Sequence, residues 1–189
     1  MPIRAARFLS LLFGALALGT TLAHVLERPA KLQYPAALWI TIQHTLYAQF
    51  GQPNLIAYVE PAAIACALAL AILLLRRPRP IRGSDGRAAA IAALTCLVLA
   101  FPLVYYWLVE PVNVILRSVR PSSPPSNWSA LREQWETGQA IRFFLHLLGF
   151  SLLVLSALEE PERRVTVRDP GQTWLTRAGW RRGGRAAER

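Results

Sequence analysis

The side chains of this chain that are suited to chemistry are histidines, carboxylates and one arginine, which lie in or beside long apolar stretches. A histidine or a carboxylate can take a proton from a substrate, and an arginine can stabilise the resulting anion. His24 and Glu27 end the first stretch, Glu60 opens the second, and Arg142 lies within the fourth. They predict a pocket with His24 and Arg142 as catalytic residues and, as its other members, Glu27, Glu60, Glu110, Asn113, Trp135 and His146.

Helical spacing brings several of these side chains onto common faces. Thr20, His24 and Glu27 follow one another at intervals of four and three residues, which places them on one face of a helix. In the fourth stretch, a continuous helix gives a polar stripe of Trp135, Gln139, Arg142 and His146. Ionisable groups inside a membrane usually face the interior of a bundle or water. The spacing therefore predicts one cluster centred on Arg142, whose nearest carboxylate is Glu27 or Glu110.

Some of these residues also have a simpler interpretation. Glu60 precedes Pro61 and Glu110 precedes Pro111, so these two carboxylates either face the pocket or only mark helix boundaries. His146 is either a pocket residue or a histidine that is satisfied within the core. The sequence leaves both alternatives open.

The ligand types for a metal ion are present, but not with the spacing of a metal motif. His24 and Glu27 form only an i, i+3 pair, and Cys66 and Cys96 lie inside apolar stretches without a CxxC arrangement. The chain contains no GxGxxG, P-loop, GxSxG or HExxH motif. We therefore predict no metal, no cofactor and no disulfide scaffold.

Four apolar stretches must position these residues. They cover about residues 8–25, 55–75, 88–109 and 139–158. Each is close to the ~20 residues that a helix needs to cross a ~30 Å hydrocarbon core. The predicted fold class is all-α, a four-transmembrane-helix bundle with short amphipathic outer segments. A signal peptide is the alternative for the first stretch, but no A-x-A-like cleavage site lies near residues 20–23.

The charge distribution predicts the orientation of the bundle. Only 17% of the residues are charged, compared with about 25% in soluble domains. Of the 21 lysine and arginine residues, 15 lie before residue 8, between residues 76 and 87, or after residue 158. The positive-inside rule then predicts a multi-pass protein of the bacterial inner membrane with both termini in the cytoplasm. Because the net charge of +10 is concentrated in these short segments, we expect the lipid bilayer as a partner and no nucleic acid.

The segments outside the four stretches have their own patterns. In residues 34–50, Leu38, Ile42 and Leu46 fall at helical spacing, which predicts an amphipathic helix at the membrane surface. Ser126 or Asn127 is the expected N-cap of a helix that leads into the fourth stretch. Residues 159–189 form a basic cytoplasmic tail, which is either flexible or in contact with anionic lipid. Small residues in the first stretch allow close helix packing within or between chains, so the oligomeric state stays open.

Motifs at the ends of the stretches resemble those of a known family. The first stretch ends in AHVLERPAKLQY, the third in YYWLVEPVN, and NWSALREQWETGQ leads into the fourth. The pattern resembles small bacterial four-helix membrane proteins of the domain-of-unknown-function family that contains the anthrone oxygenases. It covers about residues 8–158 and maps onto His24, Glu27, Pro29, Lys31, Asn113, Trp128, Leu131, Arg132, Trp135 and Glu136. The chain departs from the family where VILRSVRPSSPPS replaces a Thr-rich stretch and where TGQ replaces an aromatic residue and a histidine.

The resemblance implies one of two kinds of function. Anthrone oxygenases add oxygen to an aromatic polyketide without a cofactor. By analogy, the chain is a cofactor-independent oxygenase or oxidoreductase of an apolar aromatic or quinone-like molecule, with His24 as base or hydrogen-bond donor and Arg142 stabilising an enolate-like anion. The alternative is a non-catalytic small-molecule-binding or accessory membrane subunit, in which the polar residues hold the bundle together.

Overall fold

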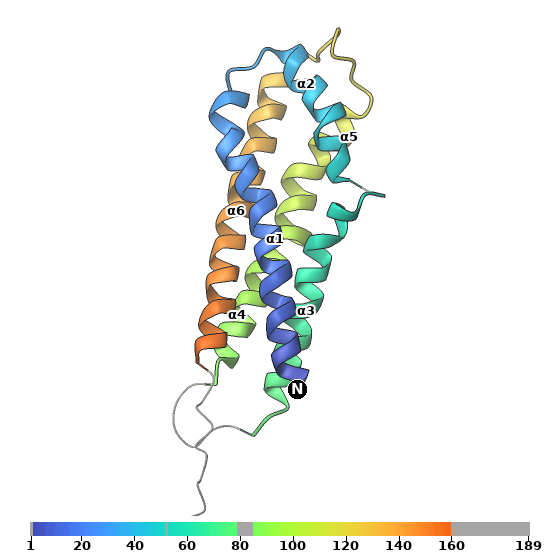
Figure 1. Ribbon diagram of the computed structural model, residues 1–189. Helices are drawn as coiled ribbons and strands as arrows, with labels where there is room; N and C mark the ends of the chain where they lie inside the picture. Colours follow the sequence, from blue (N-terminus) through green and yellow to red (C-terminus); the bar gives the residue numbers. More distant parts are fainter. Residues whose placement is uncertain (1, 52, 79–84, 160–189) are drawn as a thin grey trace, which may run out of the picture.

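The structure is a computed structural model that describes residues 2–51, 53–78 and 85–159. Figure 1 shows long helical segments running side by side, with α2 lying across one end. In chain order, the elements are α1 (Pro2–Lys31), α2 (Ala36–Thr45), the 3-10 helices η1 (Tyr47–Phe50) and η2 (Leu55–Tyr58), α3 (Val59–Leu75), α4 (Arg87–Val98), the π-helix η3 (Leu99–Val109), α5 (Glu110–Leu116) and α6 (Trp128–Leu158). The predicted all-α fold class is confirmed.

Four helical segments are long and apolar enough to cross a membrane, which makes the chain a multi-pass membrane protein. They are Pro2–Lys31, Leu55–Leu75, Arg87–Leu116 and Trp128–Leu158. Three of them exceed the predicted spans by several residues, because hydropathy marks only the part of a helix that lies in hydrocarbon. Polar turns then extend α1 and α6 beyond it. The predicted tail lies outside the described residues from position 160 onwards.

The third span changes its helical type in the middle. Pro102 lies inside η3, where it removes a backbone donor and would clash with a carbonyl group of a regular α-helix. A π-helical stretch provides the wider turn. Gly138 on α6 packs directly against η3, since an added Cβ would lie 2.8 Å from the Val109 side chain. Gln134 also donates to the Leu108 carbonyl group at 3.0 Å, so α6 holds η3 in place.

The two ends of the bundle have different interiors. We name them the N-terminal end, where Pro2 lies, and the α2 end (Figure 1). The hydrophobic core towards the N-terminal end consists mainly of alanine and leucine, with members such as Ala63, Ala67, Leu70, Ala93 and Leu97. Small residues let helix backbones approach closely where no aqueous hydrophobic effect drives them together. The core at the α2 end is instead built around Trp39, Ile40 and Trp135.

The segment that closes the α2 end forms a helix as predicted. In α2, the side chains of Trp39, Ile40 and Gln43 are buried, whereas Leu38 and Leu46 are 43% and 50% exposed. Leu38 and Leu46 of the predicted row are thus partly exposed, whereas Ile42 of the same row is more buried and, like Leu46, faces the last turns of α1. In the second outer segment, α6 begins at Trp128 and continues without a break into the fourth span, as predicted. Asn127 takes the N-cap position, but its side chain makes no capping hydrogen bond.

Candidate functional site

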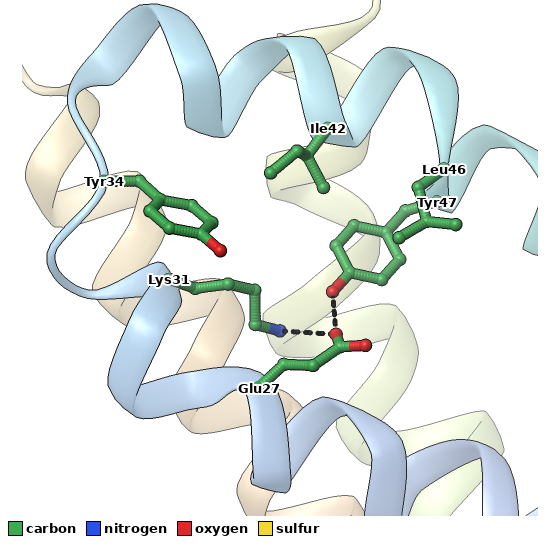
Figure 2. A pocket seen from close by; sticks show the side chains of 6 residues that line it. All are labelled: Glu27, Lys31, Tyr34, Ile42, Leu46 and Tyr47. Carbon is green, nitrogen blue, oxygen red and sulfur yellow. Dashed lines mark hydrogen bonds and ion pairs between the residues drawn. The ribbon is translucent and has the colours of Figure 1, made fainter.

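A pocket of about 170 Å³ opens at the α2 end, between the last turns of α1 and the segment α2–η1. Figure 2 shows the Tyr34 and Tyr47 rings facing each other across it, with Lys31 and Glu27 below and Ile42 above. Leu46 completes the lining. Glu27 and Lys31 lie one helical turn apart, with 3.8 Å between the Lys31 Nζ and the Glu27 Oε2. The Tyr47 hydroxyl donates a hydrogen bond to the same carboxylate.

The Lys31 ammonium group is buried and lies among carboxylates and aromatic rings. Its Nζ is 3.1 Å from the Oε2 of Glu136, whose side chain is also buried. The Nζ also lies 5.0 Å from the centre of the Tyr47 ring and 4.9 Å from that of the Trp135 ring, which is cation–π distance. We call Glu27, Lys31, Tyr47 and Glu136 the pocket cluster.

Arg132 fixes the backbone that carries this cluster. Its guanidinium group donates to the carbonyl groups of Lys31 at 3.1 Å and Tyr34 at 2.8 Å. Lys31 is the last residue of α1, and its carbonyl group also accepts from the Tyr34 N–H at 3.3 Å, whereas Tyr34 lies in the turn after the helix. The guanidinium carbon also lies 4.7 Å from the centre of the Trp128 ring. Arg132 thus sets the turn that orients Lys31 and Tyr34 towards the pocket.

Burial and the neighbouring carboxylate both act on Tyr47. Loss of water around the phenol, followed by its hydrogen bond to Glu27, raises the pKa of Tyr47 above its usual range. Tyr47 therefore remains a neutral hydrogen-bond donor around neutral pH.

His24 lies one turn before Glu27, behind the pocket wall. Its buried ring is 4.8 Å from Tyr47, 5.7 Å from Phe50 and 5.1 Å from Trp135, measured between ring centres. Its Nδ1 atom is buried without a hydrogen-bond partner among the described residues. The predicted catalytic histidine thus contacts Tyr47, which lines the pocket, rather than the pocket itself.

A chain of hydrogen bonds leads from the pocket cluster towards the third span. The indole Nε1 of Trp135 donates to the Oδ1 of Asn113 at 2.9 Å. The amide of Asn113 donates to Glu110 at 3.2 Å, and the Tyr105 hydroxyl donates to the same carboxylate at 2.9 Å. Glu110 also pairs with Arg117 at 2.6 Å, and the Arg117 side chain is 66% exposed.

Arg142 belongs to a deeper group, which we call the buried cluster and which consists of Glu60, Arg142 and His146. The guanidinium group pairs with Glu60 and donates to Gln139. It lies 5.0 Å from the centre of the Tyr105 ring. The Nε2 of His146 is 3.9 Å from the Oε2 of Glu60.

The predicted partner of Arg142 is wrong, and depth along the bundle explains why. Arg142 lies 16 residues before the end of α6 and Glu60 lies 15 residues before the end of α3. At 1.5 Å per residue, these distances are about 24 and 22 Å, so the two groups are level. Glu27 and Glu110 lie nearer the α2 end, where Tyr47 and Lys31 contact the first and Arg117, Asn113 and Tyr105 contact the second.

The predicted site residues therefore form two layers rather than one cluster. The polar stripe on α6 is confirmed, since all four of its members are buried. Sequence reasoning did not assign Lys31, Glu136, Tyr47 or Tyr105 to the site. The i, i+4 spacing between Glu27 and Lys31 could have predicted that Lys31 belongs to the site. The position of Glu136 beside Trp135 could have predicted the same for Glu136. Tyr47 reaches the site only through the packing of η1, which no local spacing indicates. Tyr105 lies five residues before Glu110, and the π-helical stretch η3 brings the two side chains together.

Among the described residues, no group of three histidine, cysteine or acidic side chains could hold a metal ion. Comparison of the chain with known protein families, curated proteins and solved structures found no match. The resemblance to the family of the anthrone oxygenases stays a prediction.

Proposed function

We propose that this protein binds a small hydroxy-aromatic or quinone-like molecule in the pocket at the α2 end and acts on it as a cofactor-independent oxygenase or oxidoreductase. The observation that carries the proposal is the pocket itself. The pocket is open on one side, and its volume of about 170 Å³ has room for one aromatic ring, since an enclosed engineered cavity of ~150 Å³ binds benzene. Two tyrosine rings form apolar walls, and an ammonium group and a carboxylate recognise a polar substituent.

The lining residues support a division of chemical roles. The Glu27 side chain is 44% exposed, and its carboxylate is the proposed base that takes a proton from a substrate hydroxyl or an acidic ring carbon. The charge of the buried Lys31 ammonium group then stabilises the resulting oxyanion, and Tyr47 holds Glu27 in place through its hydrogen bond. Dioxygen is the proposed oxidant that accepts electrons from the anion. The His24 ring packs against Tyr47 and Trp135 and holds them in position. The catalytic role of Arg142 stays a prediction, and it is not favoured because Arg142 does not line this pocket.

The orientation of the bundle is part of the proposal. The N-terminal end carries Arg4, Arg7, Arg76, Arg77 and Arg87, which favours the cytoplasmic side under the positive-inside rule. The pocket then opens near the outer surface of a bacterial inner membrane. A ligand that partitions into lipid reaches it from the interface.

A second candidate function is a non-catalytic binding or accessory subunit. The observation that favours it is that Glu27, Glu60, Glu110 and Glu136 all have a polar or cationic partner. Two of these contacts, Lys31–Glu136 and Arg142–Glu60, join different spans. They would stabilise the bundle without any reaction.

Binding to the protein in lipid nanodiscs tests the proposal. We expect calorimetry to show saturable binding of hydroquinone, 1,4-benzoquinone or 1-naphthol, and weaker binding of cyclohexanol. Ile42→Trp should fill the pocket and abolish binding. Leu38→Trp, on the exposed face of the same helix, is the matched control and should bind like the wild type.

Oxygen consumption with a bound ligand separates the two candidate functions. The enzyme hypothesis predicts consumption that Glu27→Gln reduces by at least ~10²-fold, in the range of general-base catalysis. Binding without oxygen consumption or conversion of the ligand supports the non-catalytic alternative. Absence of saturable binding, or equal binding by Ile42→Trp and Leu38→Trp, contradicts the enzyme and any binding role for this pocket, and leaves only the accessory subunit.

A further inference from the structure

The carboxylate of Glu60 and the ring of His146 face each other in the interior of the bundle, and no hydrogen bond joins them. Arg142 occupies the Oε1 of Glu60, whereas the Oε2 is buried and receives no hydrogen bond from the described residues. That free oxygen lies 3.9 Å from the Nε2 of His146. The residues belong to α3 and α6, which adjoin α1 on either side in the contacts of the bundle.

Thr21 determines which ring nitrogen of His146 carries hydrogen in the neutral form. The Thr21 hydroxyl donates to the carbonyl groups of Ala17 and Leu18, each at 3.2 Å. Since the single hydroxyl proton has these two carbonyl acceptors, we assign the Thr21 oxygen as the acceptor of a hydrogen on the Nδ1 of His146, which lies 3.4 Å away. A neutral ring then has its hydrogen on Nδ1 and a bare lone pair on Nε2. As a result, two acceptors, Nε2 and the Glu60 Oε2, face each other.

We propose that Glu60 and His146 form a proton-binding site that takes up one proton between the carboxylate and the imidazole. The bound proton turns two opposed lone pairs into a charge-assisted hydrogen bond. Without it, a buried carboxylate oxygen and a buried ring nitrogen both remain unsatisfied. The site is separate from the pocket cluster and does not depend on the proposed function.

The charged and titratable groups around this site come from every packed element. On α6, Arg142 holds the other oxygen of Glu60. On η3, the Tyr105 ring lies under Arg142, and on α1, His24 lies within the electrostatic reach of Arg142. The same spans also contain Cys66 on α3 and Cys96 on α4. Nearer their ends they carry charged side chains, which include Arg7, Glu27, Lys31, Arg87 and Glu110. Burial acts most strongly on the proton of the His146 ring, followed by the charges of Glu60 and Arg142.

The depth and exposure of the two partners indicate the route of the proton. His146 lies 12 residues before the end of α6, about 18 Å along the helix axis, and is 1% exposed. The Glu60 side chain lies about 22 Å from the same end of the bundle and is 12% exposed. The proton therefore enters from the α2 end through Glu60 and is held towards the middle of the bundle by His146.

Nuclear magnetic resonance of the three histidines tests the proposal, because the chain contains only His24, His44 and His146. The ring nitrogens are labelled with ¹⁵N in the full chain in nanodiscs, and substitution of each histidine by glutamine assigns the signals. The pH is varied from about 5 to about 9, across the range in which histidine usually titrates. We expect the Nε2 signal of His146 to move from a bare acceptor towards a protonated or hydrogen-bonded nitrogen as the pH falls.

Two variants show whether the proton is shared. Glu60→Gln places an amide donor against Nε2, so the His146 signals should become independent of pH. Glu133→Gln, on the exposed face of α6, should titrate like the wild type. An Nε2 signal that stays constant with pH in the wild type overturns the proposal, even if Glu60→Gln does not fold. A shift that survives unchanged in a folded Glu60→Gln protein also overturns it.

Discussion

The pocket cluster and the buried cluster use similar residue types in different proportions. At the α2 end, two carboxylates, Glu27 and Glu136, flank the single ammonium group of Lys31, and a pocket lies beside them. In the buried cluster, the guanidinium group of Arg142 pairs with the single carboxylate of Glu60. Along α6, Glu136 and Arg142 lie about 33 and 24 Å from the end of the helix. The clusters are thus separated by about two helical turns.

This difference shows that the depth of an ion pair within the bundle determines whether its charged groups can also bind a ligand. Near an interface, water stabilises an excess charge, so Glu27 is free to interact with a ligand as well as with Lys31. Deeper in the bundle, a charge must be balanced by a fixed partner, and arginine suits that role because its five donors stay protonated. Arg142 accordingly contacts Glu60, Gln139 and the Tyr105 ring at once.

The largest loss of stability is expected when the buried cluster loses its cation. Arg142→Leu leaves Glu60 buried without its partner, which should lower the free energy of unfolding by about 3–5 kcal/mol. Arg142→Lys should cost less, because it keeps the charge. Unfolding in mixed micelles with a rising fraction of denaturing detergent measures the change. A loss below about 1 kcal/mol would mean that Arg142 is exposed to water or lipid headgroups in the membrane.

A somewhat smaller loss is expected in the pocket cluster. Lys31→Met should cost about 3 kcal/mol, because Glu136 loses its ammonium partner while Arg28 still acts on its charge. The double variant Lys31→Met/Glu136→Gln removes the unpaired charge and should recover more than half of the loss. The same detergent titration measures both. If the two substitutions reduce stability additively, Lys31 and Glu136 do not form a coupled pair.

The smallest effect is expected at the exposed pair, which is the control for both clusters. Arg117→Leu breaks a contact of 2.6 Å to Glu110, but the Arg117 side chain is 66% exposed and water replaces it. The expected loss is under about 1 kcal/mol. A loss as large as that of Arg142→Leu would show that depth does not distinguish these pairs.

The sequence predicts the framework of this site better than its pairing. The spans and the α6 stripe follow from hydropathy and 3.6-residue periodicity, which are local properties. The partner of Arg142 depends instead on the level at which α3 begins relative to α6, and this is set by η1, η2 and the turns between them. Tyr105 lies only five residues before Glu110, and its contact depends on the π-helical turn around Pro102. Tyr47 instead reaches Glu27 through the packing of η1. Such contacts between elements leave no trace in the spacing within one helix.

Photolabelling with a photoreactive phenol tests the central claim, that the pocket at the α2 end binds an aromatic ring. After irradiation in nanodiscs, mass spectrometry identifies the modified residues. We predict adducts on pocket residues such as Tyr34 and Tyr47, suppressed by excess hydroquinone and absent in Ile42→Trp. Adducts found mainly on the exposed aromatic side chains of η3, Tyr106 and Trp107, and not reduced by hydroquinone, would contradict the account.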